Sequence, residues 1–354
     1  MKILITGNMG YVGPAVARLL RERHPDATID GFDTGFFRDC LTPEDASPEQ
    51  YLDHQHFGDI RSIDPGLLRN RDAVIHLAAI SNDPMGNRFE KVTKAINLDS
   101  SIRLGQLAAE AGVRNFIFAS SCSVYGVAKG GARQEHDPLN PMTAYAASKI
   151  GTEEGLSAIE TDMTITCLRF ATACGMSDRL RLDLVLNDFV ACALSTGEIT
   201  VLSDGTPWRP LIDVQDMALA MQWAATRPAR NGGRFLTVNA GRNEANYQVR
   251  ELAERVAAAV PGTKVDINTA APADSRSYRV DFSRYAELAP DHQPRKSLDD
   301  SIDRLVQGLS RTGFNDRDFR NSSLMRLKVL ESHMAAGRLS DELHWLPSSE
   351  KVSA

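Results

Sequence analysis

The sequence of 354 residues has few features of a secreted, membrane-bound or nucleic-acid-binding protein. Its five cysteines (40, 122, 167, 174 and 192) form an odd set without a Cys-x-x-Cys pair, which argues against a disulfide framework or a zinc site. The longest apolar runs, such as Ala73–Ile80, are far shorter than the ~20 residues that span a bilayer. A net charge of −6 without a basic block argues against nucleic acid or an anionic membrane as partner. We therefore expect a soluble, cytoplasmic protein without a metal.

Short apolar runs alternate with amphipathic segments along the chain. The runs that resemble strands are Lys2–Thr6, Thr28–Asp33, Ala73–Ala79, Asn115–Ser121, Thr164–Ala171 and Phe235–Ala240. The segments with helical spacing of apolar residues are Pro14–Arg23, Ser100–Ala111, Tyr145–Ile159, Leu182–Thr196 and Gln215–Arg227. Buried strands that alternate with helices are typical of a parallel sheet covered on both faces. The sequence thus predicts an α/β fold with a doubly wound parallel sheet of the Rossmann type.

The alternation loosens after about residue 177, where helices and short strands mix with turn signals. We therefore predict a Rossmann domain over residues 1–176, with a sheet contribution from about 206–245, and a smaller mixed α/β substrate lobe over 177–320. Residues 321–354 are expected to form a C-terminal helical extension. Its apolar Leu324, Leu327, Leu330 and Met334 share one helical face, which would pack on the body or on a dimer partner.

A glycine-rich loop, Thr6–Gly13, joins the first strand to the first helix. Gly7 would permit the tight turn, Gly10 the approach of a pyrophosphate and Gly13 the close packing of helix on strand. The amino end of the helix presents unpaired N–H groups to phosphates. The loop, with Tyr11 and Val12 at its helical end, is therefore a predicted dinucleotide site.

Asp33 ends the second strand, 26 residues after Gly7. A carboxylate there is placed to accept hydrogen bonds from the ribose hydroxyls of adenosine, and it would repel a 2′-phosphate. No arginine follows until Arg38. The pattern favours NAD over NADP.

Tyr145 and Lys149 lie four residues apart, on one face of a predicted helix. A phenol with an unperturbed pKa of about 10 is a poor base at neutral pH, but a nearby ammonium group favours its phenolate form. Tyr145 could then take a proton from a sugar hydroxyl while carbon gives hydride to NAD, with Ser121 hydrogen-bonded to the same oxygen. The three side chains form a predicted catalytic set.

Together these motifs resemble the extended short-chain dehydrogenase/reductases, in the nucleotide-sugar epimerase/dehydratase group that includes UDP-galactose 4-epimerase. The resemblance runs from Met1 to about Gly313 and also rests on Gly58–Arg61, His76–Ala79, Asn97 and Val124–Gly126. It implies that Asp59 and Ile60 contact adenine, that Leu77, Ala78 and Ala79 line the cofactor, and that Asn97 supports the sheet end near the nicotinamide. It also implies a homodimer through the helices at Ser100–Ala111 and Tyr145–Ile159.

The resemblance further implies a nucleotide-sugar substrate bound by the second lobe. Arg209 and Arg276 are similar to the arginines that bind the diphosphate, although Arg279 competes with Arg276 for that role. The other implied substrate contacts are Ser81, Asn82, Ser121, Tyr145, Thr172 and Asn187. Thr172 stands where the 4-epimerase pattern has asparagine, so the sugar and its nucleotide base stay open.

Cys122 and Ser123 stand where the 4,6-dehydratases of the family carry an Asp-Glu pair. Neither side chain can replace a carboxylate at neutral pH, so water elimination is disfavoured. The prediction is an NAD-dependent nucleotide-sugar epimerase that oxidises the sugar transiently, commonly at C4, and returns the hydride. The alternative is a nucleotide-sugar ketoreductase or dehydrogenase that uses NAD(P)H. A non-catalytic dinucleotide sensor ranks below both, because such proteins tend to lose the Tyr/Lys pair.

Overall fold

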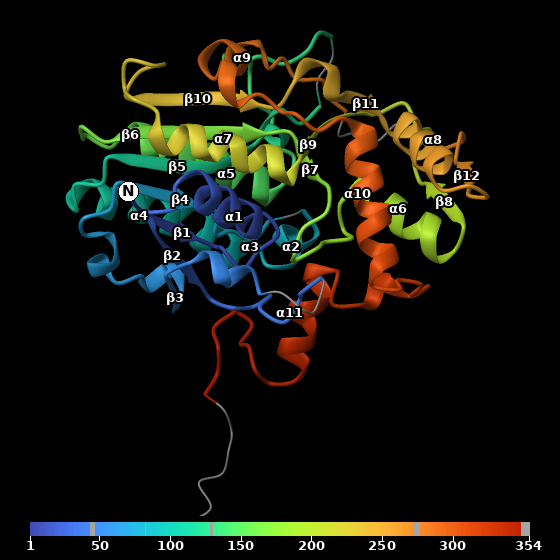
Figure 1. Ribbon diagram of the computed structural model, residues 1–354, viewed down its shortest axis with the longest axis horizontal. Helices are drawn as coiled ribbons and strands as arrows, with labels where there is room; N and C mark the ends of the chain where they lie inside the picture. Colours follow the sequence, from blue (N-terminus) through green and yellow to red (C-terminus); the bar gives the residue numbers. More distant parts are fainter. Residues whose placement is uncertain (43–46, 82, 128–129, 272–276, 348–354) are drawn as a thin grey trace, which may run out of the picture.

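The computed structural model describes residues 1–42, 47–81, 83–127, 130–271 and 277–347 (Figure 1). Its centre is a seven-stranded parallel sheet with the strand order β10-β6-β5-β4-β1-β2-β3. The strands are β1 (Lys2–Thr6), β2 (Thr28–Asp33), β3 (His54–Phe57), β4 (Ala73–His76), β5 (Asn115–Ser121), β6 (Thr164–Phe170) and β10 (Phe235–Ala240). The predicted doubly wound parallel sheet is confirmed.

Helices cover both faces of this sheet. Helices α1 (Gly13–Arg23) and α7 (Val214–Thr226) lie on one face, and α4 (Ser100–Glu110) and α5 (Ala144–Ser157) lie on the other (Figure 1). The strands alternate accordingly: Ile3 and Ile5 of β1 pack with the first pair of helices, whereas Leu4 packs on the opposite side. Both faces are apolar, as expected for a sheet covered on both sides.

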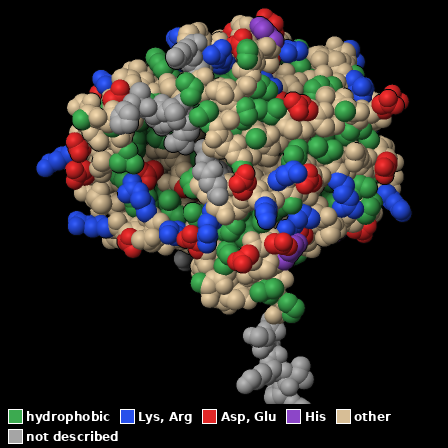
Figure 2. Space-filling view, turned by 180° about the vertical axis from the view of Figure 1, so that it is seen from behind, with side chains coloured by type: hydrophobic (Ala, Val, Ile, Leu, Met, Phe, Trp, Pro, Cys, Tyr) green, Lys and Arg blue, Asp and Glu red, His purple; other side chains and the backbone are tan. Residues whose placement is uncertain are grey.

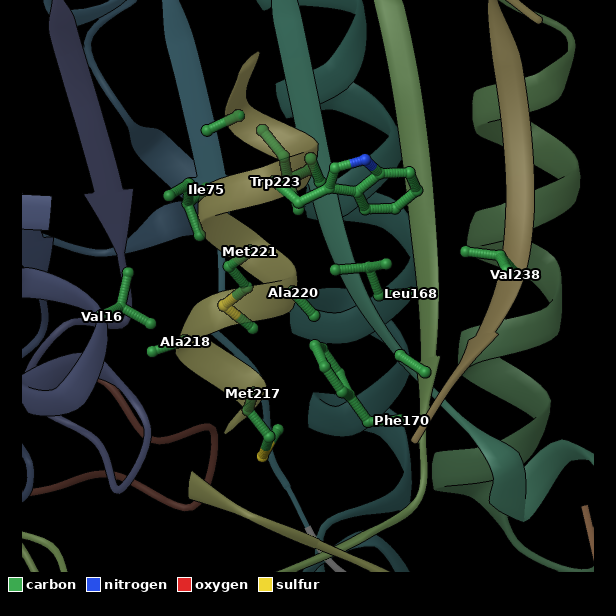
Figure 3. Close-up of a cluster of buried hydrophobic side chains, with 14 of the residues drawn as sticks. Val16, Ile75, Leu168, Phe170, Met217, Ala218, Ala220, Met221, Trp223 and Val238 are labelled. Carbon is green, nitrogen blue, oxygen red and sulfur yellow. The ribbon is translucent and has the colours of Figure 1, made fainter. Parts of the chain in front are cut away.

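Helix α7 shows how the first face is packed. In Figure 3 its Met217, Met221 and Trp223 lie in one cluster with Leu168 and Phe170 of strand β6, and the Trp223 ring extends across the sheet. Each of these five side chains is at most 6% exposed. Burying a side chain of this size stabilises the fold by about 1.5–3 kcal/mol.

The smaller C-terminal lobe has its own core. Helices α6 (Val185–Ser195), α8 (Val249–Ala259) and α10 (Leu298–Arg311) pack with the two-stranded sheet of β8 (Glu198–Val201) and β12 (Lys264–Ile267). A three-stranded sheet contains β7 (Thr172–Cys174), β9 (Trp208–Asp213) and β11 (Asn246–Gln248). The stretch 206–245 was expected to contribute to the large sheet. Its strand β10 belongs to that sheet and its helix α7 covers one face, whereas its strand β9 belongs to the three-stranded sheet.

Two predicted elements differ from the observed ones by three residues at one end. The strand expected over 73–79 ends at His76, because Leu77–Ile80 leave the ladder and turn toward the cleft described below. The helix expected from Leu182 begins at Val185, because Leu184 has an extended backbone. The remaining helices are α2 (Asp83–Arg88), α3 (Glu90–Thr93), the π-helix η4 (Lys94–Asp99) and α9 (Ser283–Leu288), and short 3₁₀ turns connect other elements.

Among the described residues of the C-terminal segment, α11 (Arg326–Ala335) is the one longer helix, and the chain continues from it without regular helix to residue 347. Leu330, Leu339 and Leu343 are buried in the same hydrophobic cluster as Leu4 and Val74 of the large sheet. The C-terminal segment was expected to pack either on the body of the protein or on a dimer partner, and the structure shows that it packs on the body. None of the helices in the described part of the chain has the length and apolar character needed to cross a membrane.

Candidate active site

A cleft of about 1060 Å³ opens where the strands of the large sheet end at their carboxyl termini. The loops after β1, β2, β4 and β5 form one wall, and segments of the second lobe form the other. Figure 2 shows a hollow in the surface with hydrophobic side chains in its walls and Lys and Arg side chains near its rim. Ligands of open α/β sheets bind at this edge of the sheet.

The glycine loop forms one end of the cleft. Gly7 has φ +76°, and a Cβ at this position would lie 2.4 Å from the backbone nitrogen of Ala78. A Cβ at Gly13 would lie 2.0 Å from the carbonyl oxygen of Asn8. The N-cap residue of α1, Val12, makes no side-chain capping bond, and the amino end of a helix suits a phosphate. Tyr11 and Val12 also line the cleft there.

Asp33 lies on the next strand, at the adenosine end of the predicted site. Its carboxylate accepts hydrogen bonds from the backbone N–H groups of Met9 (3.0 Å) and Gly35 (2.7 Å). Burial raises the pKa of Asp33, and the two N–H groups oppose that effect. These bonds fix the carboxylate beside the glycine loop, where it lines the cleft. Each oxygen keeps a lone pair for a ribose hydroxyl.

Asp59 and Ile60 line the same end of the cleft. The Asp59 carboxylate accepts bonds from the backbone N–H and the guanidinium of Arg61. Burial alone would raise the pKa of Asp59, but the Arg61 bonds and charge lower it. Leu77, Ala78 and Ala79 extend this wall toward the catalytic end. Asn97 lies behind them, and its buried amide bonds both the N–H (2.8 Å) and the carbonyl (2.9 Å) of Ile80.

The three predicted catalytic side chains line one cleft. Ser121 is the last residue of β5, and Tyr145 is the second residue of α5, whose amino end is capped by Thr143. All three side chains line the cleft, and the Lys149 Nζ lies 5.4 Å from the centre of the Tyr145 ring. Lys149 also donates to the Ala119 carbonyl (2.7 Å). A phenol, a hydroxyl and an amine thus share one site.

Lys149 is only 3% exposed, and its environment controls its charge. Burial lowers the pKa of Lys149 to about 7, while the carboxylate of Glu153 acts in the opposite direction. Glu153 lies one helical turn further along α5, where it accepts bonds from Arg169 (2.7 Å) and Ser120 (2.5 Å). The ammonium beside Tyr145 is therefore part of a buried charge network, which the sequence motifs did not reveal.

The predicted substrate residues divide into three groups. Ser81, Thr172 and Arg209 line the cleft, together with Ser121 and Tyr145. Asn187 does not: its side chain is fully buried and bonds the Gly175 N–H, the Arg181 carbonyl and the Tyr11 hydroxyl. It therefore positions the loop beside the cleft instead of facing a ligand. Asn82 and Arg276 lie outside the described residues.

Sequence reasoning missed Arg181, which lines the cleft on the substrate side. Its guanidinium donates to the Ser81 hydroxyl (2.8 Å) and forms an ion pair with Asp183 (2.8 Å). Burial disfavours the charged form of Arg181, but the Asp183 carboxylate more than offsets this and raises the pKa of the arginine, so a cation lines this part of the cleft. The only sequence signal was an Arg-x-Asp pattern before a helix, which by itself is too common to identify a site.

The cleft fits a dinucleotide in shape and chemistry. Three features lie along one wall, in the order that phosphates and ribose require. They are the glycines whose positions leave no space for a side chain, the amino end of α1, and the Asp33 carboxylate held by backbone N–H groups. Within the described residues, no group of three or more His, Cys, Asp or Glu side chains is placed to hold a metal ion.

Comparisons with known proteins agree with this geometry. The UDP-glucose 4-epimerase of Mycolicibacterium smegmatis is 28% identical over 87% of this chain and 98% of its own length. The dTDP-glucose 4,6-dehydratase of Actinoplanes sp. is 25% identical over 86% and 97%. The solved structure of MoeE5 with UDP-glucose and NAD shares the fold, with a TM-score of 0.74, 23% identity and coverage of 88% and 99%.

The model of the NAD dependent epimerase/dehydratase family matches residues 3–241, which include the glycine loop, Asp33 and all three catalytic candidates. The matched region also ends with the last strand of the large sheet. The chain therefore belongs to the NAD-dependent epimerase/dehydratase family, and its cofactor is NAD.

Proposed function

We propose that this enzyme epimerises a nucleotide-activated sugar by transient oxidation, at C4, to a keto-sugar. The observation that carries this proposal is that Ser121, Tyr145 and Lys149 line the same cleft as the glycine loop, with the Lys149 Nζ 5.4 Å from the centre of the Tyr145 ring. This set suffices to move one proton and to orient one carbinol. Bound NAD supplies the acceptor for the hydride and returns it.

Each side chain has one task in the proposed reaction. The Tyr145 oxygen accepts the proton of the sugar hydroxyl, as the carbon–hydrogen bond of the same carbon breaks and its electron pair leaves as hydride. Ser121 donates a hydrogen bond to the reacting oxygen. Lys149 favours the phenolate by its charge, because an ammonium stabilises a neighbouring anion. Tyr145 gives the proton back after hydride has returned to the opposite face of the keto-sugar.

The positions of the carboxylates in the cleft argue for epimerisation and against water elimination. Four carboxylates belong to the described residues that line the cleft. Asp33 and Asp59 lie at the adenosine end, Asp183 is paired with Arg181, and Asp188 is paired with Arg320 (2.8 Å). Cys122, at the position where 4,6-dehydratases of the family carry an acid, is 1% exposed and donates to the Arg169 carbonyl. Elimination needs a free acid and base beside the sugar, and the described catalytic end offers Tyr145, Ser121 and Ser123 instead.

The substrate wall supports a diphosphate-linked sugar. Arg209, on β9, lines the cleft with a guanidinium suited to bidentate bonds with phosphate. Thr172, Ser81 and Arg181 also line the cleft and offer hydroxyl and N–H groups. These groups would bind the hydroxyls of the sugar.

The test is an assay with UDP-, dTDP-, GDP- and CDP-hexoses, followed by proton NMR of the sugar and by absorbance at the nicotinamide band. Epimerisation gives a new hexose with no net change in absorbance. Net consumption of NADH with a 4-keto sugar nucleotide would show a ketoreductase instead, and a 4-keto-6-deoxy product would show a dehydratase.

The dimer is likewise a proposal. Helices α4 and α5 pack side by side on one face of the sheet, since a Cβ at Gly155 would lie 2.4 Å from the side chain of Ile102. The other faces of these two helices carry exposed residues such as Arg103 and Ala147. We propose that they pair with a second copy, and light scattering that gives a monomer mass would contradict this.

A further inference from the structure

The C-terminal strap, residues 319–347, lies outside the stretch that the family model matches. It does not pack only on the second lobe. From α11 onward it reaches the side of the large sheet where β2 and β3 lie, and Figure 1 shows α11 and the red segment after it beside this edge. That edge carries the adenosine end of the dinucleotide site.

The strap holds the loop that follows Asp33. The Trp345 Nε1 donates to the carbonyl of Thr34 (2.7 Å), and its ring lies 5.6 Å from the ring of Phe36. The Nε2 of His333, on α11, donates to the Phe36 carbonyl (3.0 Å). Thr34 and Phe36 both line the cleft. One wall of the adenosine site is thus tied to the strap by two hydrogen bonds and an aromatic contact.

The strap also holds the second adenosine loop. The guanidinium of Arg61 donates to the carbonyls of Glu342 (2.8 Å) and Leu343 (3.2 Å) and contacts the His344 ring (3.0 Å). The same guanidinium binds the Asp59 carboxylate. The two loops on either side of the adenosine site therefore meet on one segment of chain, although residues 61 and 343 are 282 positions apart.

A third contact comes from Arg326, the first residue of α11. Its side chain is 1% exposed and lines the cleft, and its guanidinium lies 4.8 Å over the Phe37 ring. It donates to the Arg179 carbonyl (2.7 Å), and its Nη1 has no hydrogen-bond partner in the described part of the chain. Burial lowers the pKa of Arg326 to about 10, which leaves it positively charged at neutral pH. A buried positive charge beside the cleft suits an anionic dinucleotide.

We propose that the C-terminal strap is a cofactor-retention element, in which Trp345 and Arg61 hold the two adenosine loops together and slow the release of NAD. The physical reason is preorganisation. Loops that are already ordered lose less conformational entropy when the dinucleotide binds, and they must separate before its adenosine end can leave. The proposal rests on the family's cofactor and is independent of which sugar reaction the enzyme performs.

The experiment measures the release of the dinucleotide from the full-length protein. The protein is loaded with NADH and mixed with a large excess of NAD⁺ in a stopped-flow fluorimeter, and the loss of bound-NADH fluorescence gives the dissociation rate. Trp345→Ala is expected to raise this rate about tenfold, and Arg61→Met by a similar factor, since each change removes contacts to one loop. The matched control is Leu346→Ala, whose side chain is exposed like that of Trp345, and its rate should stay within twofold of wild type.

Two results would overturn the proposal. One is release of NADH at the wild-type rate from both Trp345→Ala and Arg61→Met. The other is faster release in Leu346→Ala as well, which would indicate a general loosening of the chain end. If Trp345→Ala does not fold, Trp345→Phe keeps the ring contact and loses only the N–H group, and its rate should rise about threefold. A wild-type rate for that variant would also contradict the proposal.

Discussion

The dinucleotide half and the proposed sugar half of the cleft are formed by different kinds of chemical groups. The phosphate end of the dinucleotide half consists of the backbone and glycines of one short loop, where a Cβ at Gly13 would lie 2.0 Å from a carbonyl oxygen. The proposed sugar half consists of charged and polar side chains from distant segments, such as Arg181, Ser81 and Arg209. The first half has little tolerance for substitution, whereas the second can change its ligand by exchange of side chains. This difference explains why one cofactor serves relatives that act on different nucleotide sugars.

The largest effect is expected where the halves meet. Tyr145→Phe should lower turnover about a thousandfold, because it removes the only proposed proton acceptor, while NADH still binds. The measurements are the steady-state rate with the identified substrate and an NADH titration. Tyr285→Phe is the matched control, since this buried residue of α9 donates its hydroxyl to the His292 carbonyl (2.6 Å) and does not line the cleft. A near-normal turnover rate in Tyr145→Phe would contradict the proposed role of Tyr145 as proton acceptor.

The dinucleotide half can be tested by adding one methyl group. Gly13→Ala should destabilise the fold by about 3 kcal/mol and weaken NAD binding, because the backbone of Asn8 leaves no space. Gly131→Ala serves as control, since a Cβ there meets no atom within 4 Å. Urea unfolding with and without NAD measures both effects. Wild-type stability in Gly13→Ala would mean that this half is as tolerant as the other.

The sugar half should respond with a change in substrate binding. Arg181→Lys keeps the charge but loses the bidentate contact with Asp183, so KM for the sugar nucleotide should rise about tenfold. The affinity for NADH should not change. Equal losses of NADH and substrate binding would contradict the separation of the two halves.

The smallest effect concerns the charge of Lys149. If the reaction needs the ammonium form, the rate falls as the pH rises through the pKa of Lys149, which is lowered by burial to about 7. Glu153 raises that pKa, so Glu153→Gln should move the alkaline fall of kcat/KM to lower pH. Glu154→Gln, an exposed neighbour on α5, should leave the profile unchanged. A shift to higher pH in Glu153→Gln would have the wrong sign.

The sequence by itself determined six of the seven strands of the large sheet, all but β3, together with most of its helices, the glycine loop and the pairing of Tyr145 with Lys149. These features depend on local spacing: alternation of apolar residues gives strands and helices, and four residues make one helical turn. Parallel strands also bring their carboxyl ends to one edge, so the dinucleotide site could be located from order alone. The boundaries of the domains and the roles of the single site residues stay predictions.

Only the tertiary structure decided which polar side chains reach the cleft. Asn187 was expected there but is fully buried, whereas Arg181 was missed and bonds Ser81, 100 residues away. The bonds between Arg61 and the strap have no sequence signature, because they go to backbone carbonyls that every residue possesses. Contacts of this kind depend on how separate segments fold back on one another, and local patterns carry no information about that.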